Sequence, residues 1–212
     1  MIEIISHSKH AVLSDMINSW YQKIDIFMLQ SISGFTAVGI YNVGTQITEI
    51  CKFIPVSINQ SIRPAVLDLH NKNRSLFDYK LKSILSLNIY GSMLLAIILS
   101  VLAPVLIRTT SGAAFASSTV IMQIYAFTIV PVAINNTHWH YYSAYKLYKH
   151  GWIKPLTGLF ANVLLNIVLI PPFHAIGAAI ATLTALTAAS TIGTALDGQT
   201  RPLFKITLTA FR

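Results

Sequence analysis

The sequence has few charged residues, and this scarcity indicates which solvent surrounds the folded chain. Asp, Glu, Lys and Arg together make up 10% of the 212 residues, whereas hydrophobic residues make up 54% and the mean hydropathy is +0.60. A soluble globular domain carries roughly 25% charged residues. Because the chain has too little polar surface to cover a water-soluble fold, its composition predicts a membrane protein.

Cysteine and the motifs of catalysis are also scarce. The single cysteine, Cys51, lies within an apolar run, so the sequence supports no disulfide and no cysteine-based metal cluster. No Walker loop, GxGxxG, CxxC, HExxH or GxSxG motif occurs. His138 and His140 are two positions apart and would point to different faces of a helix. We therefore expect no catalytic residue, no cofactor and no metal site, and we do not expect an enzyme.

The basic residues that produce the net charge of +8 lie at the ends of apolar runs. In these places Lys and Arg set the orientation of membrane helices and contact anionic lipid headgroups. They do not form a patch that could line a nucleic-acid groove. We expect membrane lipids as partners and no nucleic acid.

Six apolar runs approach or exceed the roughly 20 residues that a helix needs to cross a bilayer. Such runs exclude β-barrel strands, because a lipid-exposed backbone must satisfy its own hydrogen bonds. The sequence thus predicts an all-α fold, a polytopic transmembrane helical bundle of about six spans, with a lobe at 1–196 and a cytoplasmic tail at 197–212. The expected spans are 11–31, 38–69, 81–106, 119–142, 153–170 and 176–196.

The segments between these spans alternate in charge. The second and fourth connections carry several lysines and arginines, among them Lys72, Arg74 and Lys146, whereas the first and fifth carry none and the third only Arg108. Positively charged connections stay on the cytoplasmic side. This alternation predicts a multi-pass protein with both termini in the cytoplasm.

The second span carries charges that a bilayer would reject. At about 100° per residue, Thr45, Lys52, Asn59 and Arg63 fall within about 40° of one another, and Glu49 flanks them. Under one interpretation, Glu49 and Lys52 neutralise each other and Arg63 reaches the interface. Under the other, the stripe lines a water-filled cavity and meets a charged substrate.

The first span adds Lys23 and Asp25, which lie on different faces of the helix. Asp25 would either pair with Lys52 or Arg63 or carry a coupling proton or ion. Together with Glu49, Lys52, Asn59 and Arg63, these two residues form the predicted cavity site.

Several segments resemble a known transporter family. They are KIDIFMLQ, VGIYNVGTQITEICKFIPVSINQSIRPAV, the basic HNKNRSLFDYKLKS and NVLLNIVLIPPFHAIGAAIAT. In this order they are similar to the polysaccharide flippases of the superfamily that includes the multidrug and toxin extrusion (MATE) exporters. The resemblance implies one lobe of a MATE-like fold. Since those transporters have about twelve helices in two lobes, it also implies a missing N-terminal lobe as a partner.

The resemblance further implies a function in O-antigen and lipopolysaccharide synthesis at the bacterial inner membrane. The expected substrate is a lipid-linked oligosaccharide, carried on polyprenyl pyrophosphate and turned to the outer face. Lys23, Lys52 and Arg63 would receive the pyrophosphate, Asn59 would bind sugar hydroxyls, and Glu49 or Asp25 would titrate. The alternatives are a MATE-type drug or cation antiporter lobe, a membrane-bound transferase and a non-transporting truncated remnant.

Overall fold

The computed structural model describes the backbone of residues 2–211 and the side chains of Met16, Trp20 and residues 23–211. Within that range every regular element is a helix, so the all-α prediction is confirmed. The two terminal residues, which were expected on the cytoplasmic side, lie outside the described residues. The longer helices are α1 (Ile2–Cys51), α2 (Phe53–Lys72), α3 (Arg74–Thr110), α4 (Ser118–Tyr125), α5 (Ile129–Ala144) and α6 (Ile153–Ser190), and the chain ends in α7 (Ile192–Ala195) and α8 (Arg201–Ala210).

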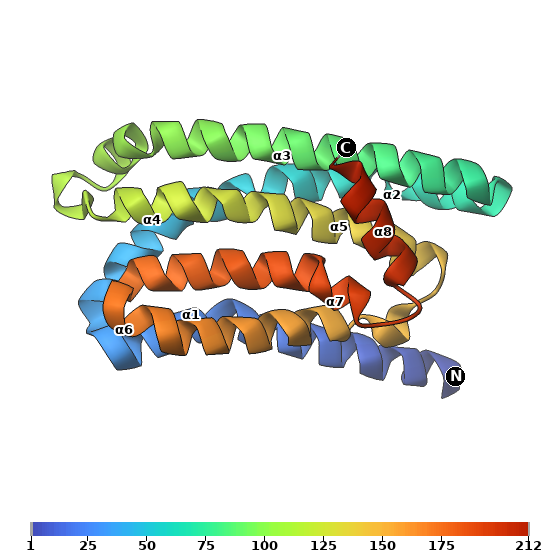
Figure 1. Cartoon of the computed structure of the whole chain (residues 1–212), viewed down its shortest axis with the longest axis horizontal. Coiled ribbons are helices and arrows are strands. Elements are labelled where there is room, and N and C mark those ends of the chain that lie inside the picture. The colour runs from blue at the N-terminus through green and yellow to red at the C-terminus, as the bar shows by residue number, and fades with distance from the viewer. Residues whose placement is uncertain (1, 212) are drawn as a thin grey trace.

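Two of the long helices reverse direction within one element (Figure 1). α1 turns back at Gly34, whose φ of 80° favours glycine because a Cβ would be strained there. α6 turns back at His174, where φ is 49°. The second reversal is so tight that a Cβ on Gly177 would clash with the Leu169 carbonyl oxygen. The Ser33 hydroxyl lies 2.9 Å from Nδ1 of His174, so the two reversals are in contact.

The bundle has the length and composition to cross a membrane. Four helical stretches qualify, at Lys23–Lys72, Arg74–Thr110, Ser118–Ala144 and Tyr148–Ala195. Because the first and last of them reverse, the described chain passes along the bundle six times. The predicted spans match these passes to within a few residues, except that the first and third helices begin earlier than expected.

The second pass is not one continuous helix. α1 ends at Cys51, α2 begins at Phe53, and Lys52 lies between them. Pro55 follows three residues later and has no N–H to donate to the Cys51 carbonyl oxygen, which removes a helical hydrogen bond at this point. The helical hydrogen bonding is therefore interrupted at this point, although Lys52 keeps helical dihedral angles.

The basic connections lie together at one end of the bundle. The α2–α3 and α5–α6 junctions, which carry Lys72, Arg74 and Lys146, lie at the right of Figure 1, and the reversals and the α3–α4 junction lie at the left. The alternation of charge along the sequence thus becomes a separation of charge in space.

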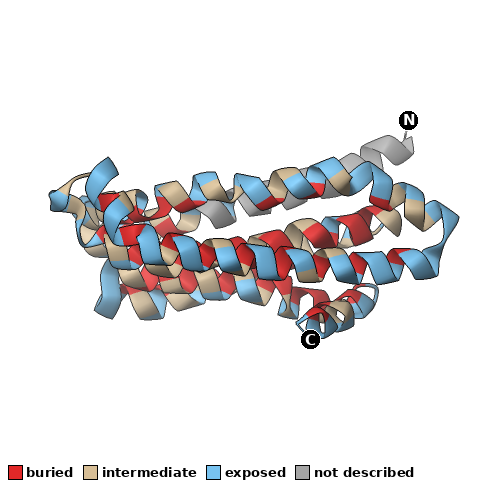
Figure 2. Cartoon of the chain, turned by 90° about the horizontal axis from the view of Figure 1, so that it is seen from above, coloured by how far each residue is buried: buried red, intermediate tan, exposed pale blue. Residues whose placement is uncertain are grey.

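Polar groups face inward and many large apolar side chains face outward (Figure 2). Phe35, Phe53, Leu87 and Val101 are each more than 70% exposed, while Asn162, Asn166 and His138 are fully buried. This distribution would be unfavourable in water and suits a surface covered by lipid. The described chain is therefore that of a membrane protein.

The segment predicted to be a cytoplasmic tail contains a helix that packs on the bundle. α8 lies across α3 and α5, with Leu203, Thr207 and Ala210 buried (Figure 1). The Ser86 hydroxyl of α3 donates to the Ala210 carbonyl oxygen at 3.1 Å. The bundle therefore extends beyond the predicted boundary at residue 196.

Candidate functional site: a polar cavity inside the bundle

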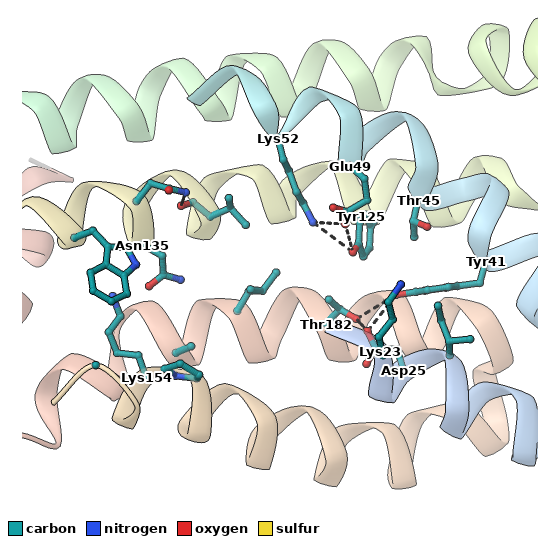
Figure 3. Close-up of a pocket in the computed structure, with 18 of the residues that line it drawn as sticks. Lys23, Asp25, Tyr41, Thr45, Glu49, Lys52, Tyr125, Asn135, Lys154 and Thr182 are labelled. Atoms are coloured by element: carbon teal, nitrogen blue, oxygen red, sulfur yellow. Dashed lines mark hydrogen bonds and ion pairs between the residues drawn. The ribbon is translucent and has the colours of Figure 1, made fainter. Parts of the chain in front are cut away.

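A cavity of about 640 Å³ lies between α1, α5 and α6 (Figure 3). Among the described residues, its charged lining consists of Lys23, Asp25, Glu49, Lys52 and Lys154. Hydroxyl, amide and aromatic side chains complete the polar lining. They are Tyr41, Asn42, Thr45, Tyr125, Asn135, Asn136, Trp139, Tyr142 and Thr182.

Asp25 lies at one end of the cavity and is bonded by neutral donors. Thr182 donates to Oδ2 at 2.6 Å, Asn166 donates to Oδ1 at 3.0 Å, and Tyr41 donates to Oδ2 at 3.3 Å. The residue is 4% exposed. The predicted partners Lys52 and Arg63 do not contact it, so the expected structural ion pair is wrong. The carboxylate is instead held by groups on α1 and on both halves of α6.

Glu49 and Lys52 form the ion pair that their spacing allows. The Lys52 ammonium donates to Glu49 Oε1 at 2.6 Å and to the Tyr125 hydroxyl at 3.3 Å, and Tyr125 donates to the same Glu49 oxygen at 2.6 Å. The ammonium also lies 4.4 Å from the centre of the Tyr125 ring. The two sequence interpretations are therefore compatible, because the pair neutralises itself and still lines the cavity.

Asn59 is a predicted cavity residue that lies elsewhere. Its amide bonds to the Asn88 amide at 3.2 Å, and its Oδ1 lies 3.2 Å from both Thr137 Oγ1 and His140 Nε2. The predicted stripe applied about 100° per residue across Pro55, where the helical hydrogen bonding is interrupted. After the break at Lys52, α2 packs on α3 and α5, so Asn59 points toward those helices.

Arg63 also lies outside the cavity. It is exposed, and its guanidinium donates to the Ser143 hydroxyl at 2.7 Å. On the second pass, Lys52 is the last residue that lines the cavity, so Arg63 lies three helical turns beyond it.

Lys23 lies in the cavity as predicted, and its side chain is exposed. Among residues 23–211, no carboxylate forms an ion pair with it. Figure 3 shows it beside Asp25, with its ammonium turned toward the cavity.

Lys154 is a cavity residue that the sequence did not identify. It is 8% exposed, and its ammonium lies 3.0 Å from Nδ1 of the fully buried His138. A lysine at the start of an apolar run is usually an interfacial topology signal, and nothing in its local sequence indicates burial. His138 bonds through Nε2 to Thr207 of α8 at 2.9 Å.

No protein-family profile, curated protein or solved structure matches the chain. The assignment of a function therefore rests on the geometry and charge of the cavity.

Proposed function

We propose that the chain is one lobe of a membrane flippase. Its substrate would be a polyprenyl-pyrophosphate-linked oligosaccharide, such as an O-antigen unit, moved across the bacterial inner membrane. The observation that carries this proposal is a cavity lined by lysines, amides and hydroxyls inside a bundle whose outer surface is apolar. Polar groups at membrane depth are expensive, and they are tolerated where they face water or a substrate.

The chemistry of the lining fits the parts of such a substrate. Lysines attract phosphate oxygens, while amides, hydroxyls and aromatic rings contact sugars. Among the described residues, three lysines and two carboxylates line the cavity, so the balance is cationic. The polyprenyl chain would stay in the lipid beside the exposed apolar side chains, and the polar head would occupy the cavity.

Transport would need a second lobe and a source of energy. Rocking of two lobes about a shared cavity gives alternating access, as in other transporters built from repeats. Asp25 is our candidate for the coupling proton or ion, because it is a carboxylate held by neutral donors within the cavity wall. Under this proposal the basic end of the bundle faces the cytoplasm.

The test uses a bacterium that lacks its own O-antigen flippase and expresses this chain together with an N-terminal flippase lobe. Surface polysaccharide is measured for the wild type, for Lys23→Gln and for the matched control Arg63→Gln. We expect Lys23→Gln to reduce surface polysaccharide at least tenfold, because it removes a cavity cation with no carboxylate partner among residues 23–211. Arg63→Gln should leave it within twofold. Equal loss in both variants, or no polysaccharide with the wild type, would contradict the proposal.

The aromatic lining favours one second candidate, an exporter of organic cations. Tyr41, Tyr125, Trp139 and Tyr142 line the cavity, and aromatic faces bind cations. The excess of lysines argues against this candidate. Uptake of ethidium into vesicles that contain the protein separates the two, since a flippase lobe should not move the dye and a cation exporter should.

A further inference from the structure

The end of the cavity opposite Asp25 holds a buried lysine, Lys154. Figure 3 shows Lys154 and Asn135 at this end, far from the cluster of Asp25, Tyr41 and Thr182. Among residues 23–211, no carboxylate forms an ion pair with Lys154. An ammonium group removed from water is unfavourable unless it is paired. The position thus resembles a cation site prepared for an anion.

The hydrogen bonds around Lys154 leave donors unused. An ammonium has three N–H donors and no acceptor. One of them is directed to Nδ1 of His138, which fixes the His138 proton on Nε2, and that N–H donates to Thr207. The Thr207 hydroxyl in turn donates to the Leu203 carbonyl oxygen at 2.8 Å. This chain of bonds holds the ammonium in place and leaves it donors for a ligand.

Neighbouring side chains supply further donors. The side-chain amide of Asn135 lines the cavity and makes no hydrogen bond with the described residues, so its Nδ2 group, and not its Oδ1, is the donor that it could offer an anion. The buried Tyr142 hydroxyl likewise has no partner in that range, and its ring lies 5.5 Å from the Lys154 ammonium. Trp139 lies beside Tyr142, with their ring centres 5.6 Å apart. Within the part of the chain whose side chains are described, no carboxylate lines this end, whereas Asp25 and Glu49 line the other.

We propose that Lys154 and Asn135, beside Trp139 and Tyr142, form an oxyanion-binding subsite at this end of the cavity. Its ligand would be either the pyrophosphate of a lipid carrier or the carboxylate of an acidic sugar. Only this choice of ligand rests on the proposed function. In this arrangement Lys154 binds the anion directly, and Lys52, already neutralised by Glu49, does not.

The experiment measures binding alone, without transport. The full chain is placed in nanodiscs of phosphatidylcholine. It carries Trp20→Phe and Trp152→Phe, so that Trp139 is the remaining tryptophan of the three. Quenching of Trp139 fluorescence then reports binding of inorganic pyrophosphate in one series and of glucuronate in another. The variants are Lys154→Gln, Asn135→Leu and the control Lys149→Gln, which removes an exposed lysine close in sequence.

We expect Lys154→Gln to raise the Kd at least tenfold and Asn135→Leu, which leaves the bonds of Lys154 to His138 intact, to raise it about threefold. Lys149→Gln should stay within twofold of the parent. The anion that shows this pattern identifies the ligand. Absence of binding by both anions, or equal affinity in the parent, Lys154→Gln and Asn135→Leu, overturns the subsite. If the chain binds pyrophosphate at this subsite but fails the polysaccharide test, the subsite stands and the flippase proposal falls. If the chain passes the polysaccharide test but binds neither anion at this subsite, only the subsite proposal falls.

Discussion

At the scale of single residues, Asn59 shows how a buried polar group is accommodated in an apolar bundle. Its amide lies against Asn88 of α3 and against Thr137 and His140 of α5, so one side chain joins three helices. Each group in this cluster depends on the others, because a buried polar group that loses its partner keeps the cost of its removal from water.

We predict that Asn59→Leu lowers the free energy of unfolding by about 2–4 kcal/mol, since it leaves at least one of the buried partners unsatisfied. Unfolding in mixed micelles, followed by circular dichroism, measures the change. Gln60→Leu is the control, because Gln60 is exposed on the same helix. Equal stability of the two variants would show that the cluster contributes nothing to the fold.

A second residue-level prediction concerns the Glu49–Lys52 pair. Tyr125→Phe removes a hydroxyl that donates to Glu49 and accepts from Lys52, but it leaves the ion pair in place. We expect a loss of about 1–2 kcal/mol in the same unfolding measurement, as for one hydrogen bond to a charged group. Tyr79→Phe, at an exposed tyrosine, is the matched control and should be neutral.

The sequence identified some site residues and missed others for a physical reason. Lys23, Asp25, Glu49 and Lys52 stand out because a charge within an apolar run is costly wherever the run is buried in a membrane. Lys154 lies at the edge of its run, where a charge is ordinary, and only the packing of α5 and α7 against it shows that it is buried.

At the scale of elements, two helical glycines differ in the space around them. A Cβ on Gly177 would meet the Leu169 carbonyl oxygen, whereas a Cβ on Gly39 would meet nothing within 4 Å. We predict that Gly177→Ala destabilises the bundle by about 1–3 kcal/mol through strain in the second reversal. Gly39→Ala should be neutral or stabilising by up to about 1 kcal/mol. The melting temperatures of the purified variants in detergent decide the matter, and a Gly177→Ala variant as stable as Gly39→Ala would contradict the tight turn.

α8 gives a second element-level prediction. Leu203 on the inner face of α8 is 1% exposed, whereas Leu208 on its outer face is 51% exposed. Leu203→Ala should cost about 2–5 kcal/mol and increase proteolysis near the C-terminus, because it leaves a cavity under the helix. Leu208→Ala should change neither quantity. If both variants are digested at the parental rate, α8 is not held by its buried face.

Most helices could be predicted from the sequence, because a run of about 20 apolar residues in lipid satisfies its backbone hydrogen bonds only as a helix. The sharp reversals were expected as short loops, since periodicity shows where a helix ends but not how abruptly the chain turns. α8 was expected as a tail because it is short and its mean hydropathy does not mark it as a span. Its buried positions Leu203, Thr207 and Ala210 become visible as one face only when the surface that they cover is known.

At the scale of the whole molecule, the separation of charge predicts an orientation. In a Cys51→Ser background, Asn71→Cys and Ala114→Cys place single thiols at exposed positions at opposite ends of the bundle. In intact bacterial cells we expect a membrane-impermeant maleimide to label position 114 and to label position 71 only after permeabilisation. Labelling of both positions from the same side would contradict the arrangement of the helices, and the reverse order would contradict the proposed orientation.

The bond between Ser33 and His174 has a mechanical consequence for the molecule. It joins the corner of the first hairpin to the corner of the last, so residues 141 positions apart along the chain share one contact at the end away from the basic connections. A movement that widens the cavity at this end must either displace both hairpins together as a rigid body or first break the hydrogen bond between Ser33 and His174. If the hairpins rotate about this contact, their displacement would be largest at the opposite end of the bundle, beside Lys154.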